Sequence, residues 1–187
     1  MTGDTATATE TRATTQTCTD PVLSNPLAGL GDARHYFTAP GGRFEDRGTA
    51  GWTLSGNAQY NNPQSPYAVL GSSDRGSLRL QPGGSATSPA FCVDLDYPSF
   101  RFFLADLQAR DGSLDVEVIY PELENDNVFL SARLTARKSW SLSPDVMLEP
   151  ERAGASFGWR KVAIRFTAHG ANADFHIDDL VVDPRMR

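Results

Sequence analysis

The chain has 187 residues, of which 40% are hydrophobic and 10% aromatic, and it carries a formal net charge of −6 at pH 7. This length fits one domain with a tail and is sufficient to bury a core. The 17 basic residues are scattered along the sequence, whereas duplex-binding proteins gather them on one face, so we expect no nucleic-acid partner. No apolar run approaches the roughly 18 residues that a membrane span requires.

Residues 1–20 hold nine threonines and almost no large apolar side chain. Such a segment cannot bury enough surface to offset the entropy that it loses on ordering. We therefore predict a disordered tail over residues 1–20 and one folded domain over residues 21–187. The first residues contain neither a basic nor an apolar stretch, so no signal peptide is visible in this chain.

The two cysteines, Cys18 and Cys92, form neither a CxxC motif nor a cluster with zinc-binding spacing. A bond between them would tether the tail to the predicted strand around Cys92 and stabilise the fold by about 4 kcal/mol. We expect this disulfide, and with it an oxidising, extracellular or cell-surface location. The alternative is a cytoplasmic protein with two unpaired thiols.

Beyond Tyr36 the sequence alternates short apolar segments with turns, and no stretch predicts a helix of three turns. Residues 113–120 and 128–136 show the clearest alternation. It places Leu114, Val116, Val118 and Tyr120 on one face, and Val128, Leu130, Ala132 and Leu134 together opposite Phe129, Ser131, Arg133 and Thr135. Further strands are predicted within residues 44–45, 51–55, 77–80, 85–93, 100–104, 140–142, 160–166 and 174–182, and the longest loops are predicted at residues 56–76, 121–127 and 143–158. Eight or nine strands of this spacing predict an all-β fold, an antiparallel β-sandwich of the jelly-roll type.

The last predicted strand breaks its own alternation. Phe175 and Ile177 share one face, but Leu180 and Val182 fall in the opposite register. One extra residue at Asp178-Asp179 restores the pattern, which predicts a β-bulge there.

The sequence shows no arrangement typical of catalysis. The three histidines, His35, His169 and His176, follow no recognisable nucleophile pattern, and there is no GxSxG motif. His176 alternates away from the apolar face, so we expect it at the surface. Asp115 and Glu117 share a strand face that we expect to be solvated, and we predict a protein without enzymatic activity.

Calcium is a better candidate, because this hard cation needs about 6–8 oxygen ligands. Glu45 lies beside a glycine-rich turn near the start of the domain, and Asp178 and Asp179 lie at the predicted bulge on the last strand. First and last strands of a sandwich are commonly neighbours, so these three carboxylates can form a structural calcium site. The alternative is that they cap turns and face water.

Sugar binding needs exposed aromatic rings flanked by polar groups. Trp52 shares its face with Leu54, so we expect it in the core. Trp159 shares its strand face with Lys161 and Arg165, not with Val162 and Ile164, so we expect it to be exposed. The candidate ligand-binding residues are therefore Trp140, Trp159 and Tyr67.

Three segments resemble carbohydrate-binding modules of the galactose-binding-like jelly-roll type. These are Phe44-Glu45 with residues 51–58, similar to a "GFE…GW…GGA" opening, residues 159–168, similar to "W-x-x-V…F-T-A", and residues 175–182, similar to a closing "F-x-I-D-D-V". Residues 85–93 and 101–103 resemble a group of uncharacterised secreted actinobacterial proteins. The resemblance implies a jelly roll, a structural calcium at Glu45, Asp178 and Asp179, and a Trp159 that packs and does not bind.

Two functions remain open from the sequence. The free-standing domain and the threonine-rich tail favour an extracellular or cell-surface domain, binding or structural, that contacts protein partners. The alternative is a carbohydrate-binding module that recognises a polysaccharide or cell-wall glycan.

Overall fold

The computed structural model describes residues 18–45, 51–61, 65–72, 74–108, 111–123, 127–153 and 158–184. Most of the predicted tail, residues 1–17, lies outside the described residues. Those described form thirteen strands and two short 3-10 helices, so the all-β prediction is confirmed, although the strands outnumber the predicted eight or nine. No helix in the described ranges has the length and apolar character needed to cross a membrane.

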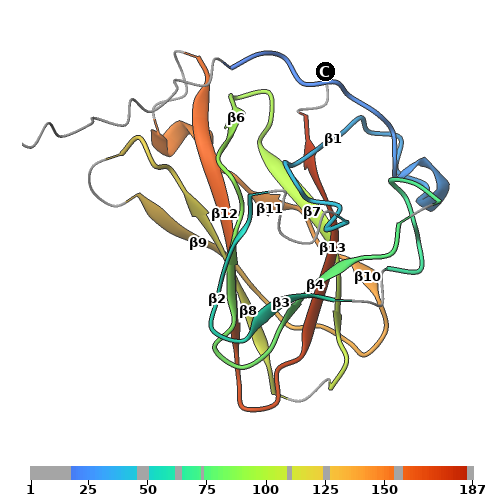
Figure 1. Ribbon diagram of the computed structural model, residues 1–187. Coiled ribbons are helices and arrows are strands. Elements are labelled where there is room, and N and C mark those ends of the chain that lie inside the picture. Colours follow the sequence, from blue (N-terminus) through green and yellow to red (C-terminus); the bar gives the residue numbers. More distant parts are fainter. Residues whose placement is uncertain are drawn as a thin grey trace, which may run out of the picture.

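Two antiparallel sheets pack against each other as a sandwich (Figure 1). The seven-stranded sheet has the order β10-β7-β13-β4-β3, with β1 on β13 and β11 on β7; the six-stranded sheet has the order β2-β5-β12-β8-β9, with β6 on β12. The strands are β1 (Phe37–Thr38), β2 (Thr53–Ser55), β3 (Ala58–Asn61), β4 (Ser77–Leu80), β5 (Ser85–Thr87), β6 (Phe91–Val93), β7 (Ser99–Asp106), β8 (Ser113–Ile119), β9 (Val128–Leu134), β10 (Ser141–Leu142), β11 (Val146–Met147), β12 (Arg160–His169) and β13 (Phe175–Asp183). The 3-10 helices are η1 (Ala28–Leu30) and η2 (Pro150–Ala153).

The core between the sheets follows the predicted alternation on β8 and β12. Val116 and Val118 on β8, like Ile164 and Phe166 on β12, are fully or almost fully buried. Trp52 lies in this core as expected: its ring is parallel to that of Phe166, and its indole N–H donates to the Pro40 carbonyl at 3.0 Å.

A second apolar cluster covers the outer face of the seven-stranded sheet. Leu27 and Tyr36 of the N-terminal segment pack with Phe103 of β7 and Val181 of β13, and all four are fully buried. Residues 65–72 also contribute to this cover. As a result every residue of β13 is buried. The prediction that His176 lies at the surface is therefore wrong. Its side chain points out of the sheet, but into the covering layer.

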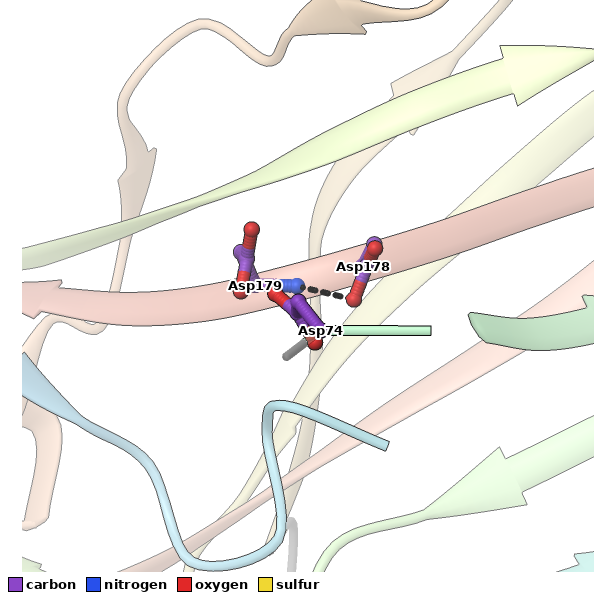
Figure 2. Close-up of side chains that lie close together, drawn as sticks. All are labelled: Asp74, Asp178 and Asp179. Carbon is purple, nitrogen blue, oxygen red and sulfur yellow. Dashed lines mark hydrogen bonds between the residues drawn. The ribbon is translucent and has the colours of Figure 1, made fainter. Parts of the chain in front are cut away.

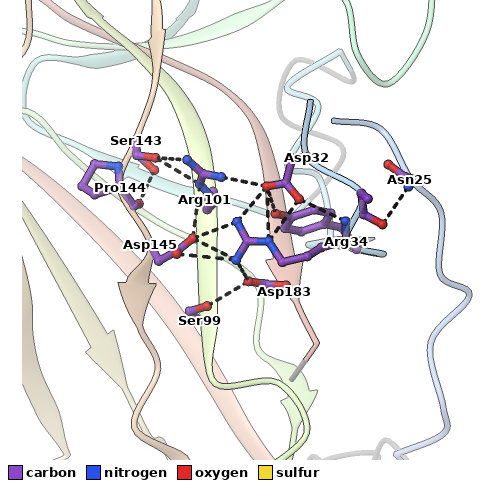
Figure 3. A network of polar contacts seen from close by, with 11 residues as sticks. Asn25, Asp32, Arg34, Ser99, Arg101, Ser143, Pro144, Asp145 and Asp183 are labelled. Atoms are coloured by element: carbon purple, nitrogen blue, oxygen red, sulfur yellow. Dashed lines mark hydrogen bonds and ion pairs between the residues drawn. The ribbon is translucent and has the colours of Figure 1, made fainter. Parts of the chain in front are cut away.

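An ion-pair network anchors the N-terminal segment to this sheet (Figure 3). Arg34 pairs with Asp32 at 2.7 Å, with Asp145 at 3.4 Å and with Asp183 at the end of β13, and Arg101 of β7 pairs with Asp32 at 3.0 Å. The hydrogen bond from the Arg34 side chain holds the pKa of Asp32 well below its usual range. These charge-assisted contacts bind a loop segment to the ends of two strands.

The structure joins Cys18 to Cys92 in a disulfide, with a Cα–Cα distance of 5.7 Å. Cys92 lies on β6, so the bond attaches the start of the N-terminal segment to the six-stranded sheet. The predicted pairing is confirmed.

On β9 the predicted alternation is wrong. The register shifts at a β-bulge, because Val116 pairs with Ala132 and the next residue of β8, Glu117, pairs with Leu130, which leaves Ser131 unpaired. The extra residue reverses which face each side chain takes. Phe129 therefore packs on the core, whereas Val128 and Leu130 point outward with exposed fractions of 38% and 55%.

Three smaller predictions are also corrected. Phe44–Glu45 is not a strand but lies in a tight turn, with Phe44 at a left-handed φ of 54°. Ala58–Asn61 forms β3 within a predicted loop, and Val146–Met147 forms β11 within another. Both are edge strands whose pairing with β4 and β7 compensates for a weak local pattern.

Candidate functional site

The predicted bulge on β13 is confirmed. The pairing of β13 with β7 shifts between Asp178 and Val181, and Asp179 takes a left-handed φ of 47°. A left-handed backbone is uncommon outside glycine, although aspartate tolerates it better than most residues. Such conformations concentrate where a fold holds a functional group in place.

The bulge brings Asp178 and Asp179 next to Asp74, which lies just before β4 (Figure 2). One carboxylate oxygen from each residue lies within 4.8 Å of the others, and all three residues are buried. Asp178 accepts hydrogen bonds from the backbone N–H of Ser65 at 2.8 Å and of Asp179 at 2.9 Å. Both carboxylate oxygens of Asp74 and both of Asp179 are buried without a hydrogen-bond partner. Leaving such groups buried and unpaired is costly, so the arrangement fits a cation.

The pKa values of Asp74, Asp178 and Asp179, which we call the acidic cluster, also favour a bound cation. Burial, with the neighbouring Glu45 and Asp179 carboxyls, raises the pKa of Asp74 to about 8. Burial also raises the pKa of Asp178 and of Asp179 to about 7. Three carboxylates that repel one another would gain most from a divalent cation held by oxygen ligands.

Glu45, the third residue of the predicted metal set, lies at the edge of the cluster. Its Oε1 accepts hydrogen bonds from the backbone N–H of Arg75 at 2.8 Å and of Gly76 at 2.6 Å. Burial opposes ionisation of Glu45, but the interaction with the nearby Asp74 carboxyl and the hydrogen bonds from these two amides outweigh it, so its pKa lies below the usual value. Through these two hydrogen bonds Glu45 holds in place the loop that contains Asp74.

Gly76 lets this loop approach closely. A Cβ at that position would lie 2.5 Å from the Phe44 carbonyl oxygen, so only glycine fits. Asp74 was not predicted as part of the site, because the long loop before β4 has no periodicity. The available signal was an acidic residue two positions before a glycine at the start of a strand.

A different surface lies on the outer face of the six-stranded sheet. It is a depression of about 450 Å³, lined by Thr53, Ser55, Ser85, Thr87, Asp115, Glu117, Arg165, Thr167 and His169. Its side chains come from β2, β5, β8 and β12, whose alternation directs one polar set outward. We name this surface the polar face.

Bidentate ion pairs hold the charged groups of the polar face in place. Arg165 donates to both oxygens of Glu117 at 2.6 and 2.9 Å. Arg133 does the same to Asp115 at 2.6 and 2.8 Å, and its hydrogen bonds lower the pKa of Asp115. Asp115 and Glu117 therefore face outward and are each paired with an arginine, but the prediction that both are solvated is wrong for Asp115, which is buried. Forked pairs of this kind orient both partners.

The three candidate stacking residues do not meet at one place. Tyr67 stacks on Phe103 with ring centroids 4.6 Å apart, and its hydroxyl lies 3.4 Å from the Trp140 carbonyl oxygen, so Tyr67 and Trp140 are neighbours on the covered sheet. Tyr67 is 41% exposed, whereas Trp140 is half-buried. Trp159 is half-buried and stacks on Tyr97, which agrees with the packing role that the family resemblance implies.

One serine–histidine–aspartate series also occurs among the described residues. The Ser77 Oγ lies 3.5 Å from His176 Nδ1, and His176 Nε2 lies 3.6 Å from Asp174 Oδ1. All three residues are buried, and Arg79 already forms two hydrogen bonds with Asp174. A nucleophile must reach its substrate, so this arrangement is structural.

No protein-family model matches the sequence, and no curated protein matches it. Solved structures do match. The K2 cleaved adhesin domain of Lys-gingipain is 14% identical, with a TM-score of 0.51 over 79% of this chain and 98% of that one. A xylan-binding domain of carbohydrate-binding module family 22 is 14% identical, with a TM-score of 0.50 over 82% and 96%. The CBM22-GH10 modules of Clostridium thermocellum xylanase 10B are 13% identical, with a TM-score of 0.52 over 80% and 28%.

At these identities the likeness shows the fold alone. The chain is a β-sandwich of the kind found in carbohydrate-binding modules, which confirms the fold-level part of the resemblance. The similarity to secreted actinobacterial proteins stays a prediction.

Proposed function

We propose that this chain is a non-catalytic, extracellular module that binds a polysaccharide through the polar face. The observation that carries the proposal is the asymmetry of the sandwich. The N-terminal segment covers much of the outer face of the seven-stranded sheet, whereas the outer face of the six-stranded sheet presents an open depression lined by nine polar residues. Its volume of about 450 Å³ falls within the range of about 300–1,000 Å³ typical of ligand clefts.

The chemistry of the polar face suits a neutral sugar. Hydroxyl side chains of Thr and Ser both donate and accept hydrogen bonds, as sugar hydroxyls do. Asp115 and Glu117 can accept from sugar hydroxyls, and because each is matched by an arginine, the surface has little net charge to attract an ionic ligand. The structural likeness to a xylan-binding domain supports a neutral polysaccharide such as xylan as the first ligand to test.

Two other hollows, of about 610 and 620 Å³, border the N-terminal segment. Their shared Arg34 is committed to the ion pairs that anchor the segment, and much of their lining is loop. The polar face is built on strands, which hold side chains more precisely than loops do, and we prefer it for that reason.

This proposal reverses the order that the sequence favoured. Contact with a protein partner came first there, whereas the structural neighbours favour the glycan alternative. The patch of Tyr67 and Trp140 remains the second candidate for a glycan, with Trp159 predicted to be structural. The disulfide supports an oxidising, extracellular location.

We further propose that Asp74, Asp178 and Asp179 bind a calcium ion, with Glu45 fixing the loop around it. The four unpartnered carboxylate oxygens of Asp74 and Asp179 support this, since all donors in the cluster are hard oxygens. Bound calcium would neutralise the cluster and hold the loop before β4 against β13, a structural role away from the polar face.

The test is retention of the protein on a panel of insoluble and immobilised polysaccharides, xylan included. We expect the wild type to be retained by at least one, and the Glu117→Gln/Arg165→Met variant to lose at least tenfold in affinity. The double change removes the Glu117 carboxylate and the Arg165 guanidinium together, so neither charged group is left without its partner. Tyr67→Ala is the matched control and should bind as the wild type does. No retention on any polysaccharide, or loss only in Tyr67→Ala, contradicts the proposal.

A further inference from the structure

The longest edge strand among the described residues is β9, which pairs with β8 on one side only. An edge strand presents unpaired backbone groups that can pair with another strand, and proteins usually protect such edges. β11 meets β9 near Ser131, whose hydroxyl donates to the Met147 carbonyl at 2.6 Å. No backbone bond between β9 and β11 accompanies this contact in the described ranges, so the stretch before Ser131 is the open part of the edge.

The register identifies which backbone groups face outward there. The Tyr120 N–H donates to the Asn127 carbonyl at 2.8 Å, and Val118 pairs with Phe129. In an antiparallel ladder, bonded and non-bonded positions alternate. Asn127 and Phe129 therefore direct their backbone groups to β8, and Val128 and Leu130 direct theirs away from the sheet.

The same two residues carry the exposed apolar side chains of this edge. The bulge at Ser131 turns Val128 and Leu130 to the outer face, where they are 38% and 55% exposed, and Met147 beside them is 47% exposed. If two copies of β9 pair antiparallel about Phe129, Val128 of each copy lies opposite Leu130 of the other. Directly opposed side chains on one sheet face contact each other, so both exposed residues would become covered.

The charges flanking β9 fit this antiparallel arrangement. Before the strand, residues 121–127 hold three acidic residues and no basic one: Glu122, Glu124 and Asp126. From Val128 to Trp140 the sequence holds three basic residues and no acidic one: Arg133, Arg137 and Lys138. Glu122, Arg137 and Lys138 are exposed. Antiparallel pairing sets Glu122 of each copy beside Arg137 and Lys138 of the other, and the two-fold symmetry of such a contact forms this arrangement twice.

We propose that the chain forms a homodimer through antiparallel pairing of β9 with β9 of a second copy. Val128 exchanges backbone hydrogen bonds with Leu130 of the second copy, and the two six-stranded sheets become continuous. This inference does not depend on the proposed glycan binding.

The experiment is the molar mass in solution, measured by light scattering and sedimentation over a concentration series. The wild type should approach twice the monomer mass of 20.3 kDa, and Leu130→Lys should remain monomeric, because each new ammonium group would lie opposite the apolar Val128 of the other copy, where pairing would strip its water. Leu30→Lys is the control: Leu30 is 45% exposed on η1 and should dimerise normally. A wild type that stays monomeric at millimolar concentration overturns the proposal.

Charge reversal tests the orientation. Glu122→Lys and Arg137→Glu should each raise the dissociation constant several-fold, and the double variant should return it close to the wild-type value. Hydrogen exchange at the amides of Val128 and Leu130 should slow as concentration rises. If the double variant is weaker than either single one, or if those amides exchange equally fast in monomer and dimer, the antiparallel β9 interface is wrong.

Discussion

Asp178 and Asp179 are consecutive residues of one strand, yet each places a carboxylate oxygen within 4.8 Å of the other. Successive side chains of a regular strand point to opposite faces of the sheet. The bulge at the left-handed Asp179 removes that alternation and turns both acids toward Asp74. The irregularity of β13 is therefore what assembles the acidic cluster.

The first prediction concerns calcium and pH. Burial raises the pKa of Asp74 to about 8 and of Asp178 and Asp179 to about 7, from an ordinary value of 3.8. Between these values the folded state binds more protons than the unfolded state, so the stability of the metal-free protein falls as pH rises from about 4 to about 8. Calcium binds the ionised form, so its stabilising effect should grow over the same range.

Melting curves at pH 5.5 and 8, with calcium or with chelator, check this prediction. At pH 8, calcium at about 100 times its dissociation constant should raise the Tm by roughly 5–10 °C, and at pH 5.5 the increase should be much smaller. A calcium effect that is equal at both pH values, or absent at both, is inconsistent with the site.

The second prediction distinguishes the effect of repulsion within the acidic cluster on stability from the effect of bound calcium. Asp179→Asn removes one buried charge and the repulsion around it, so the metal-free variant should melt above the metal-free wild type at pH 8. The same change removes a calcium ligand, so the calcium-induced rise in Tm should largely disappear. Asp20→Asn, a change at an exposed acid, should alter neither. An Asp179→Asn variant that loses stability without metal and still responds to calcium would show that Asp179 is not a ligand.

The third prediction concerns the anchor of the N-terminal segment. Arg34→Ala leaves the buried Asp183 without its cationic partner, which should cost about 3 kcal/mol. Arg152→Ala breaks an exposed pair with Glu149 and should cost less than about 1 kcal/mol. Urea unfolding of both variants measures the difference; equal losses would mean that the network adds nothing beyond a surface ion pair.

The fourth prediction concerns the disulfide. Replacing Cys18 and Cys92 together by serine opens a loop with a sequence separation of 74 residues and should lower the free energy of unfolding by about 4 kcal/mol. Limited proteolysis should then cut first within residues 18–35, since the segment keeps the Arg34 anchor but loses its covalent one. The intact wild type should show no alkylated cysteine without reductant; two alkylated cysteines in protein from an oxidising compartment would refute the bond.

Some features were predictable because a local pattern carries them. The sandwich follows from the alternation on β8 and β12, where every second residue is large and apolar. The bulge on β13 was visible because bulky apolar residues flank it in opposite registers, Phe175 and Ile177 before it and Leu180 and Val182 after it.

Other features depend on contacts between distant segments. On β9 the sequence alternates without a break, because Ala132 and Leu134 share parity with Val128 and Leu130; only the pairing with β8 reveals the bulge at Ser131. The burial of His176 involves Trp140, whose ring centroid lies 6.1 Å from its own and whose position no local pattern encodes. Asp74 joins the acidic cluster for the same reason, through a loop held by Glu45.

The central claim is that the polar face binds a polysaccharide, and backbone chemical-shift mapping tests it most directly. The 15N-labelled protein is titrated with an oligosaccharide of whichever polysaccharide retains it, starting with xylo-oligosaccharides. We predict that the perturbed amides map to β2, β5, β8 and β12 around Thr87, Asp115, Glu117 and Arg165, with Tyr67 unchanged. Chemical-shift changes confined to Tyr67 and the strands beneath it, with no change at the amides of the polar face, would contradict binding at the polar face.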